Sequence, residues 1–213
     1  GEVEDYLVNI LPTAPQVQNV VINNGEATRS KVTSVTVEFD SEVDHTALQS
    51  AFTVTNITTN TPVGTVNVAP TDSGGKTTAV LTFAGASTIV PSNPSLATSL
   101  GDGFYRLDIA VVQVKLTAGN KSAMAIDYVF VNKVKIDETP YNAGNDNFFR
   151  WYGDADGDGD TDFADFANGF LQAYGSTMGT NGYLEDLDFD GDADVDFADF
   201  ANGFLGKYGS VRP

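Results

Sequence analysis

The chain has 213 residues, no cysteine and a formal net charge of −18. Without cysteine there is neither a disulfide framework nor a thiolate metal site, and the acidic balance excludes nucleic acid and anionic membranes as expected partners. Hydrophobic residues make up 41% of the chain, which is enough for a folded core. No apolar run approaches the roughly 18 residues of a membrane helix, so we expect no membrane insertion.

Short β-strands are predicted between Tyr6 and Ile136. Val35, Val37 and Phe39 alternate with polar residues, which is the period of a half-buried strand. Similar patterns cover residues 66–68, 80–83, 105–116 and 125–131. Turn signals rich in Gly and Asn separate them, at residues 23–25, 72–75, 101–103 and 119–120. Many short strands with regularly spaced turns predict an antiparallel β-sandwich.

The composition changes after residue 136. The segment 137–147 is rich in turn formers and short of large aliphatic residues, so it is predicted to be a linker. Residues 146–213 include 15 acidic and 3 basic side chains, whereas the preceding 145 residues include 14 and 8. Two thirds of the excess negative charge therefore lies in the last third of the chain. This concentration indicates either a solubilising surface or a cation site.

The acidic part of the chain contains an internal repeat. Residues 154–176 and 188–210 are identical at 18 of 23 positions, at an offset of 34. A duplicated unit of this size predicts a pseudo-symmetric pair in which each copy covers the apolar face of the other.

Each copy begins with an acidic loop whose oxygen-bearing residues follow the order of an EF-hand. Carboxylates occupy loop positions 1, 3, 5 and 12, position 7 offers its backbone carbonyl, and position 9 often binds through water. Hard oxygen ligands without His or Cys exclude a preference for zinc or copper. The predicted cofactor is therefore Ca²⁺ at two sites, with metal binding coupled to folding. The predicted ligands are Asp154, Asp156, Asp158, Asp160 and Asp165 in the first loop and Asp188, Asp190, Asp192, Asp194 and Asp199 in the second.

The two loops differ at position 6, where an EF-hand loop turns sharply. The first loop has Gly159 there and the second has Ala193. An alanine at positive φ costs on the order of 1 kcal/mol. We therefore expect the second site to be weaker or distorted.

A solvated acidic run, an RTX-like repeat or a thrombospondin-type repeat would also be rich in Asp. The residues that follow each loop argue against these alternatives, because apolar side chains recur with the spacing of one helical face. Gly175 and Gly209 then fit helix ends. The apolar residues are Phe163, Phe166, Ala167, Phe170, Leu171 and Tyr174 in the first copy and Phe197, Phe200, Ala201, Phe204, Leu205 and Tyr208 in the second.

The segment 154–210 resembles a type I dockerin, because it has two loop–helix units, Asp165 and Asp199 at loop position 12, and no helix leading into each loop. The lead-in 148–153 looks like the form found in large secreted proteins of planctomycete-type bacteria. Residues 12–136 look like the bacterial Ig-like modules found beside such dockerins, and residues 1–6 look like the end of a GEVED-type module.

The resemblance implies a two-domain chain. Residues 1–11 would be the tail of a preceding module or a linker, and residues 12–136 an all-β, Ig-like antiparallel sandwich. After the linker 137–147, residues 148–213 would form a small α-helical dockerin-like domain with two EF-hand-type calcium loops. The whole would be a piece of a larger multimodular extracellular or cell-surface protein.

Dockerins of the cellulosome bind cohesin domains through loop positions 10 and 11 and the outer helix face. Here positions 10 and 11 are Phe163-Ala164 and Phe197-Ala198. Positions 17 and 18, often Lys-Arg in the family, are Phe170-Leu171 and Phe204-Leu205, and we expect these to serve the domain's own core. The near-identity of the two copies permits a symmetric, two-way binding surface.

Isolated residues give no sign of catalysis. His45, the only histidine, lies in a polar stretch and is expected at the surface. Trp151 is expected to pack on the helices rather than to stack on a sugar. The sequence has no G-x-S-x-G, P-loop or Rossmann signature, so we expect no enzyme activity.

Three functions remain open for a chain that is expected to be a monomer. The leading hypothesis is a non-catalytic, calcium-binding attachment module that binds a cohesin-like partner. The second is a calcium-stabilised cap that packs on its own Ig-like domain. The third is a carbohydrate-binding module formed by the sandwich.

Overall fold

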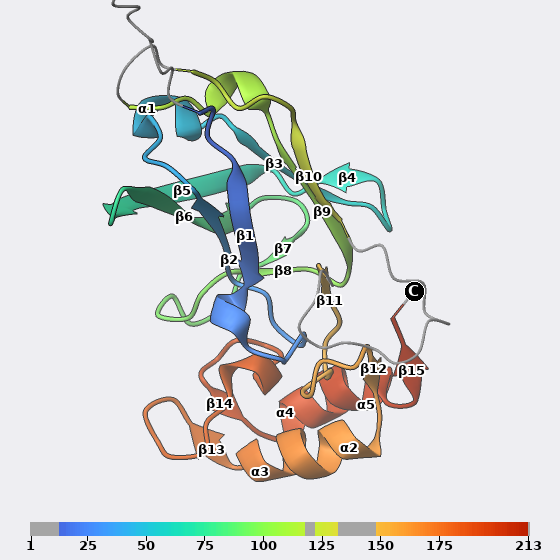
Figure 1. Cartoon of the computed structure of the whole chain (residues 1–213). Coiled ribbons are helices and arrows are strands. Elements are labelled where there is room, and N and C mark those ends of the chain that lie inside the picture. Colours follow the sequence, from blue (N-terminus) through green and yellow to red (C-terminus); the bar gives the residue numbers. More distant parts are fainter. Residues whose placement is uncertain (1–12, 118–121, 132–147, 213) are drawn as a thin grey trace, which may run out of the picture.

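The computed structural model describes residues 13–117, 122–131 and 148–212 (Figure 1). The predicted tail 1–11 and linker 137–147 lie outside these residues. The first sheet has four antiparallel strands in the order β1-β2-β6-β5. Their bounds are Val17–Ile22 (β1), Val35–Phe39 (β2), Lys76–Ala84 (β6) and Thr65–Ser73 (β5).

The second sheet has the order β10-β9-β3-β4, and β11 pairs with β9 as well. A separate two-stranded pair, β7 and β8, and the short helix α1 complete this part of the chain. The bounds are Tyr128–Val131 (β10), Gly103–Ile109 (β9), Phe52–Asn56 (β3), Thr61–Pro62 (β4), Phe149–Arg150 (β11), Thr88–Ile89 (β7), Ser99–Leu100 (β8) and His45–Leu48 (α1).

The buried side chains of these strands form one hydrophobic core, which confirms the predicted β-sandwich. Val35, Val37 and Phe39 are fully buried and alternate with partly exposed neighbours along β2, as the sequence pattern predicts. Phe148, in the lead-in to the acidic repeat, belongs to the same core. We call the described residues 13–131 the sandwich and residues 148–212 the repeat region.

The strand predicted over 105–116 ends earlier, at Ile109. The backbone N–H of Val111 donates to Asp127 Oδ1 (2.7 Å) instead of to a neighbouring strand, and a 3₁₀ turn follows over Val111–Gln113. The apolar residues beyond Ile109 keep the sequence pattern of a strand, but they do not form one.

The hairpin between β5 and β6 depends on two glycines. Ser73 pairs with Lys76, so Gly74 and Gly75 alone form the turn, with φ of +60° and +80°. A two-residue turn with two left-handed residues matches the twist of the flanking strands.

Each copy of the repeat forms one short helix with a π-helical turn in its middle. The predicted helix ends are confirmed, because Gly175 and Gly209 have φ of +81° and +76°. The first helix comprises α2 (Phe163–Asp165), the π turn Phe166–Phe170 and α3 (Leu171–Ala173). The second comprises α4 (Phe197–Asp199), the π turn Phe200–Phe204 and α5 (Leu205–Lys207).

Two small strand pairs connect the copies reciprocally. The segment after the second helix pairs with the first acidic loop, and the segment after the first helix pairs with the second acidic loop. Each copy therefore supplies a strand to the acidic loop of the other. The strands are β12 (Asp160–Thr161) with β15 (Ser210–Val211), and β13 (Ser176–Thr177) with β14 (Asp194–Val195).

The repeat region has its own small core and lies at one end of the sandwich (Figure 1). Its core contains Tyr152, Phe170, Ala173, Leu187, Val195 and Phe204. None of the helices in the described part of the chain is long and apolar enough to cross a membrane.

Candidate metal centre

Loop 1, residues 154–165, is closed by carboxylates that accept hydrogen bonds from its own backbone. Asp154 is fully buried, and its two oxygens accept from the N–H groups of Gly157 (2.6 Å) and Gly159 (3.0 Å). At the other end, Asp165 Oδ1 accepts from Ala155 N–H (2.7 Å). These bonds hold the first and last carboxylates inside the loop.

The carboxylates of loop 1 meet in two groups that share Asp165. Within each group, one oxygen per residue lies within 4.8 Å of the others. Two oxygens that each lie about 2.4 Å from one calcium ion are at most about 4.8 Å apart, so both groups have spacings that fit a shared cation. The groups are Asp154, Asp156 and Asp165, and Asp160, Asp162 and Asp165.

The end of loop 1 is also the beginning of a helix. Asp162 caps α2 by accepting a hydrogen bond from Ala164 N–H (2.6 Å), and Asp165 Oδ2 accepts from Asp162 N–H (2.8 Å). This capping box satisfies backbone donors that the first helical turn leaves free. The start of the helix and the position of Asp165 are therefore fixed by the same bonds.

Burial and, after it, the crowding of acidic groups disfavour the charged form of the loop carboxylates. Burial, followed by the charge of Asp165, raises the pKa of Asp154 to about 8. Burial, followed by the charge of Asp158, raises the pKa of Asp160 to about 6. A divalent cation at this place would offset both the burial of these carboxylates and the repulsion between them.

Loop 2, residues 188–199, repeats the arrangement. Asp188 Oδ2 accepts from Ala193 N–H (2.9 Å), and Asp199 Oδ1 accepts from Phe189 N–H (2.6 Å). Burial raises the pKa of Asp199 to about 6. The two groups with oxygens within 4.8 Å are Asp188, Asp190 and Asp199, and Asp194, Asp196 and Asp199.

The predicted difference at loop position 6 is present in the backbone. Ala193 has φ of +83°, close to the +96° of Gly159. Ala193 thus adopts the left-handed conformation that the loop requires, with the strain that a Cβ adds there.

One buried oxygen in each loop supports the fit to a cation. Asp160 Oδ1 and Asp194 Oδ1, both at position 7, are buried and accept no hydrogen bond from any described residue. A buried carboxylate oxygen without a donor is unfavourable, and a cation is a partner of the right charge. The sequence assigns only the backbone carbonyl of position 7 to the metal, whereas the structure also brings this side chain into a group.

The predicted ligands at position 5 lie outside these groups. Asp158 Oδ1 accepts from Asp160 N–H and Asp192 Oδ1 accepts from Asp194 N–H, both at 3.1 Å. All the other predicted ligands belong to at least one group.

Loop 1 packs against the sandwich through its backbone. The carbonyl of Asp154 accepts from the N–H groups of Arg29 (3.0 Å) and Ser30 (2.9 Å). A Cβ at Gly157 would lie 1.9 Å from the carbonyl oxygen of Ala27. Glycine at this position therefore permits the close approach of the two backbones.

Loop 2 packs against a different segment of the sandwich. The carbonyl of Gly191 accepts from Asn93 N–H (2.6 Å), and that of Asp190 accepts from Ser92 Oγ (3.0 Å). A Cβ at Gly191 would lie 2.5 Å from Pro91 Cβ. Both loops thus present their position-4 glycine to the sandwich. We call this pair of contacts the seam.

An ionic cluster adds to the seam. Asp102 of the sandwich lies 2.5 Å from Arg150 Nη1 and 2.8 Å from Lys207 Nζ. Burial acts to raise the pKa of Asp102, but Arg150 and Lys207 outweigh it and hold the pKa below its ordinary value. Lys207 also lies 3.8 Å from the centroid of the Trp151 ring, so Trp151 contacts helix α5, as predicted.

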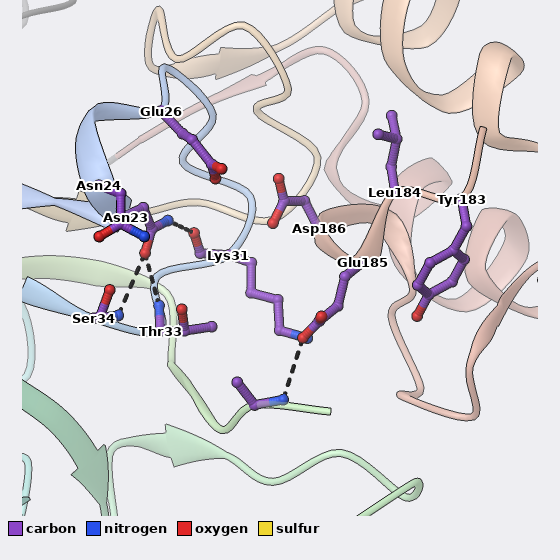
Figure 2. A pocket seen from close by; sticks show the side chains of 11 residues that line it. Asn23, Asn24, Glu26, Lys31, Thr33, Ser34, Tyr183, Leu184, Glu185 and Asp186 are labelled. Carbon is purple, nitrogen blue, oxygen red and sulfur yellow. Dashed lines mark hydrogen bonds and ion pairs between the residues drawn. The ribbon is translucent and has the colours of Figure 1, made fainter. Parts of the chain in front are cut away.

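A polar crevice of about 320 Å³ opens beside the seam (Figure 2). Lys31 on the sandwich side binds Glu185 Oε1 at 2.6 Å. Figure 2 shows the side chains of Glu26 and Asp186 extending toward each other from the two regions. Burial, followed by the charge of Glu26, raises the pKa of Asp186 to about 6.

The expectation that the apolar residues at positions 17 and 18 serve the core is wrong for position 18. Phe170 and Phe204 are buried, but Leu171 and Leu205 are 55% and 57% exposed. A two-helix unit buries one row of side chains between its helices, so the edges of a wide apolar stripe stay in solvent. We call the exposed residues of this stripe the apolar face: Phe163, Leu171, Tyr174, Phe197, Leu205 and Tyr208.

The residues of the seam were not identified from the sequence. Ser30 and Asp102 lie 124 and 52 positions before Asp154 along the chain, and no local pattern marks them. Only the glycines at loop position 4 could have indicated the seam. The order of metal ligands gives no reason for a glycine there, so their presence points to a close contact with another part of the chain. His45, as expected, lies near the surface, with its Nε2 2.9 Å from Asp72.

No known protein family and no curated protein matches this chain. Among solved structures, the chain is similar to the N-terminal part of the bacterial S-layer protein SbsC, at 22% identity and a TM-score of 0.34, over 56% of this chain and 23% of that one. The structures of rSbsC(31-844) and of SbsC domains 1-6 align equally well, over 14% of each. The chain thus spans less than a quarter of these proteins, and so weak a likeness assigns no function.

Proposed function

We propose that the chain is a non-catalytic, calcium-dependent attachment module, in which an Ig-like spacer precedes a dockerin-like domain of a larger extracellular protein. The observation that carries this proposal is the repeated gathering of carboxylate oxygens within 4.8 Å, in each loop with a buried oxygen that lacks a donor. Each loop would hold one Ca²⁺ in the manner of an EF-hand-type site. The ions would shape a recognition surface and take no part in chemistry.

The apolar face is the surface that we propose for a partner protein. It lies on the helices, whereas the loops contact the sandwich. Its members come in three pairs related by the repeat, and a groove of about 280 Å³ runs between Phe163, Phe200 and Tyr208. Exposed apolar patches of this kind mark interaction sites. A cohesin-like protein is the partner that we propose, and the paired residues would allow it to bind in two orientations.

Calorimetric titration of the whole chain with calcium tests the metal sites. We expect about two ions per chain and a higher melting temperature with calcium than with a chelator. Magnesium serves as the control, because its demand for octahedral geometry and bound water disfavours a cage of carboxylates. A chain that binds no calcium would refute the proposal.

Affinity capture from the secretome of the source organism tests the partner. We expect a cohesin-like protein to be retained in calcium and released by a chelator. The double variant Phe163→Ser/Phe197→Ser should lose it. Ile126→Ser is the matched control, because Ile126 is an exposed apolar residue of the sandwich. Equal retention by both variants would exclude the apolar face.

A second function is favoured by the seam. The repeat region could serve as a calcium-stabilised cap on its own sandwich, since both loops bond to sandwich backbone. In that case calcium would raise the melting temperature of the sandwich, and capture would yield no calcium-dependent partner.

A further inference from the structure

Ser30 has an unusual position in the seam. It is fully buried in the segment between β1 and β2. Its N–H donates to the carbonyl of Asp154 (2.9 Å), and its carbonyl accepts from Arg150 Nε (2.6 Å). Its Oγ accepts from Gly153 N–H (2.9 Å) and donates to the carbonyl of Asp186 (2.5 Å). One sandwich residue thus uses its N–H, carbonyl and hydroxyl groups on the repeat region.

The partners of Ser30 lie at the entrances of both acidic loops. Gly153 directly precedes Asp154, the first residue of loop 1, whereas Asp186 lies two residues before Asp188, the first residue of loop 2. The single hydroxyl of Ser30 therefore connects the entrances of the two loops. It accepts a hydrogen bond before loop 1 and donates one before loop 2.

We propose that Ser30 is a positioning residue that couples the two calcium sites to each other and to the docking of the repeat region on the sandwich. Fixing the backbone of Asp154 and Asp186 orients the carboxylate at position 1 of each loop. The loops then lose less conformational entropy when calcium binds. By linkage, calcium in either loop favours the docked arrangement and so favours calcium in the other loop. The inference rests on the proposed calcium sites.

The substitution Ser30→Ala would keep the backbone bonds and remove both hydroxyl bonds. Gly153 N–H and the carbonyl of Asp186 would each lose a buried partner. Each lost hydrogen bond changes an equilibrium constant by roughly fivefold. Because these two bonds help to order the loops before calcium binds, their loss should lower the calcium affinity as well as the stability of the chain.

Calcium titration of Ser30→Ala in the full chain tests the coupling. We expect the dissociation constants of both sites to rise roughly threefold to tenfold. We also expect any positive cooperativity between the sites to disappear. The gain in melting temperature on adding calcium should shrink relative to the unchanged chain. A purely structural role would lower the melting temperature with and without calcium by the same amount.

Ser99→Ala is the matched control. Ser99 is also a buried serine whose Oγ accepts one hydrogen bond, from Val32 N–H (3.0 Å), and donates another, to the carbonyl of Leu100 (2.9 Å). Both partners lie in the sandwich, so Ser99→Ala should lower stability without changing calcium affinity. Should Ser30→Ala fail to fold, Ser30→Cys keeps a weaker donor and acceptor at the same place on a somewhat larger atom, and we expect weaker bonds to the same two partners and a loss of calcium affinity in the same direction.

The outcomes separate the two proposals. Absence of calcium binding by the unchanged chain refutes the calcium sites and, with them, the coupling. Normal calcium affinity and cooperativity in a folded Ser30 variant refutes the coupling alone.

Discussion

Loop 1 and loop 2 share most of their sequence but differ in what holds them. The carbonyl of Asp154 in loop 1 is fixed by Arg29 and Ser30 of the sandwich. The side chain of Asp188 in loop 2 accepts a hydrogen bond from the Tyr183 hydroxyl (2.7 Å), within the repeat region itself. The two loops also contact separate sandwich segments. A repeated sequence therefore produces repeated ligand geometry, while the environment of each copy is set by distant residues.

Removal of calcium should have the largest effect on both loops. With free calcium about 100-fold above the dissociation constant, each proposed site would contribute about 2.7 kcal/mol. Loss of both should lower the melting temperature by roughly 10–20 °C. Calorimetric scans at decreasing free calcium check this, and amide signals show which loop empties first. We expect loop 2 to empty first because of Ala193. A melting temperature that is independent of calcium would contradict the prediction.

Loss of one closing carboxylate should remove one site. Asp165→Ala and Asp199→Ala each delete a shared member of two carboxylate groups and its bonds to backbone N–H groups. We expect each variant to bind one calcium ion and to lose about 3 kcal/mol of calcium-linked stability. Titration calorimetry gives the stoichiometry. A variant that still binds two ions would show that position 12 does not close the loop.

Part of this arrangement was predictable from the sequence, because it depends on neighbours along the chain. The alternation in β2, the turn at Gly74-Gly75 and the left-handed Ala193 follow from local patterns. The seam was not predictable, because Ser30, Ser92 and Asp102 bond to residues that lie far away in sequence. The exposure of Leu171 and Leu205 was missed for a related reason. The sequence shows which side chains lie on the apolar face of a helix. How many of them are buried depends on how much of that face the neighbouring helix covers.

Removal of the ionic cluster should test how much the seam contributes to stability. Asp102→Ala leaves Arg150, which is nearly buried, without this carboxylate, and we expect a loss of about 2 kcal/mol at pH 7. The pKa of Asp102 lies below its ordinary value, so its contribution is present at neutral pH and is lost as the pH falls below about 4. Denaturation at pH 7 and pH 3 measures the difference.

The control for this variant is Asp108→Ala. Asp108 pairs with Arg106 on the sandwich surface at 2.8 Å, where both side chains are substantially exposed. Its loss should change stability by less than about 1 kcal/mol. Equal effects of the two variants would mean that the seam contributes no more than a surface ion pair.

Exchange of the residues at position 6 should reverse the ranking of the two loops in calcium affinity. Ala193→Gly relieves a left-handed alanine and should strengthen loop 2 by about 1 kcal/mol. Gly159→Ala should weaken loop 1 by at least as much, since the added Cβ would lie 2.8 Å from Arg212 Nε. The site-resolved calcium affinities of the double exchange should then rank loop 2 above loop 1. If the ranking does not change, the difference in calcium affinity between the loops comes from their contacts with the sandwich and not from position 6.

The smallest effect should come from Tyr183, whose hydroxyl bonds to the first carboxylate of loop 2 and has no counterpart beside loop 1. The repeat offset places Phe149 at the equivalent position of loop 1, but Phe149 is buried in β11, where it packs against Phe104. Tyr183→Phe deletes one hydroxyl bond to a carboxylate and should weaken loop 2 by about 1 kcal/mol, without effect on loop 1. Calcium titration of the variant in the Asp165→Ala background isolates loop 2. An equal loss at loop 1, measured in the Asp199→Ala background, would mean that the hydroxyl supports the whole repeat region, and that the copies differ less in their environment than the contacts indicate.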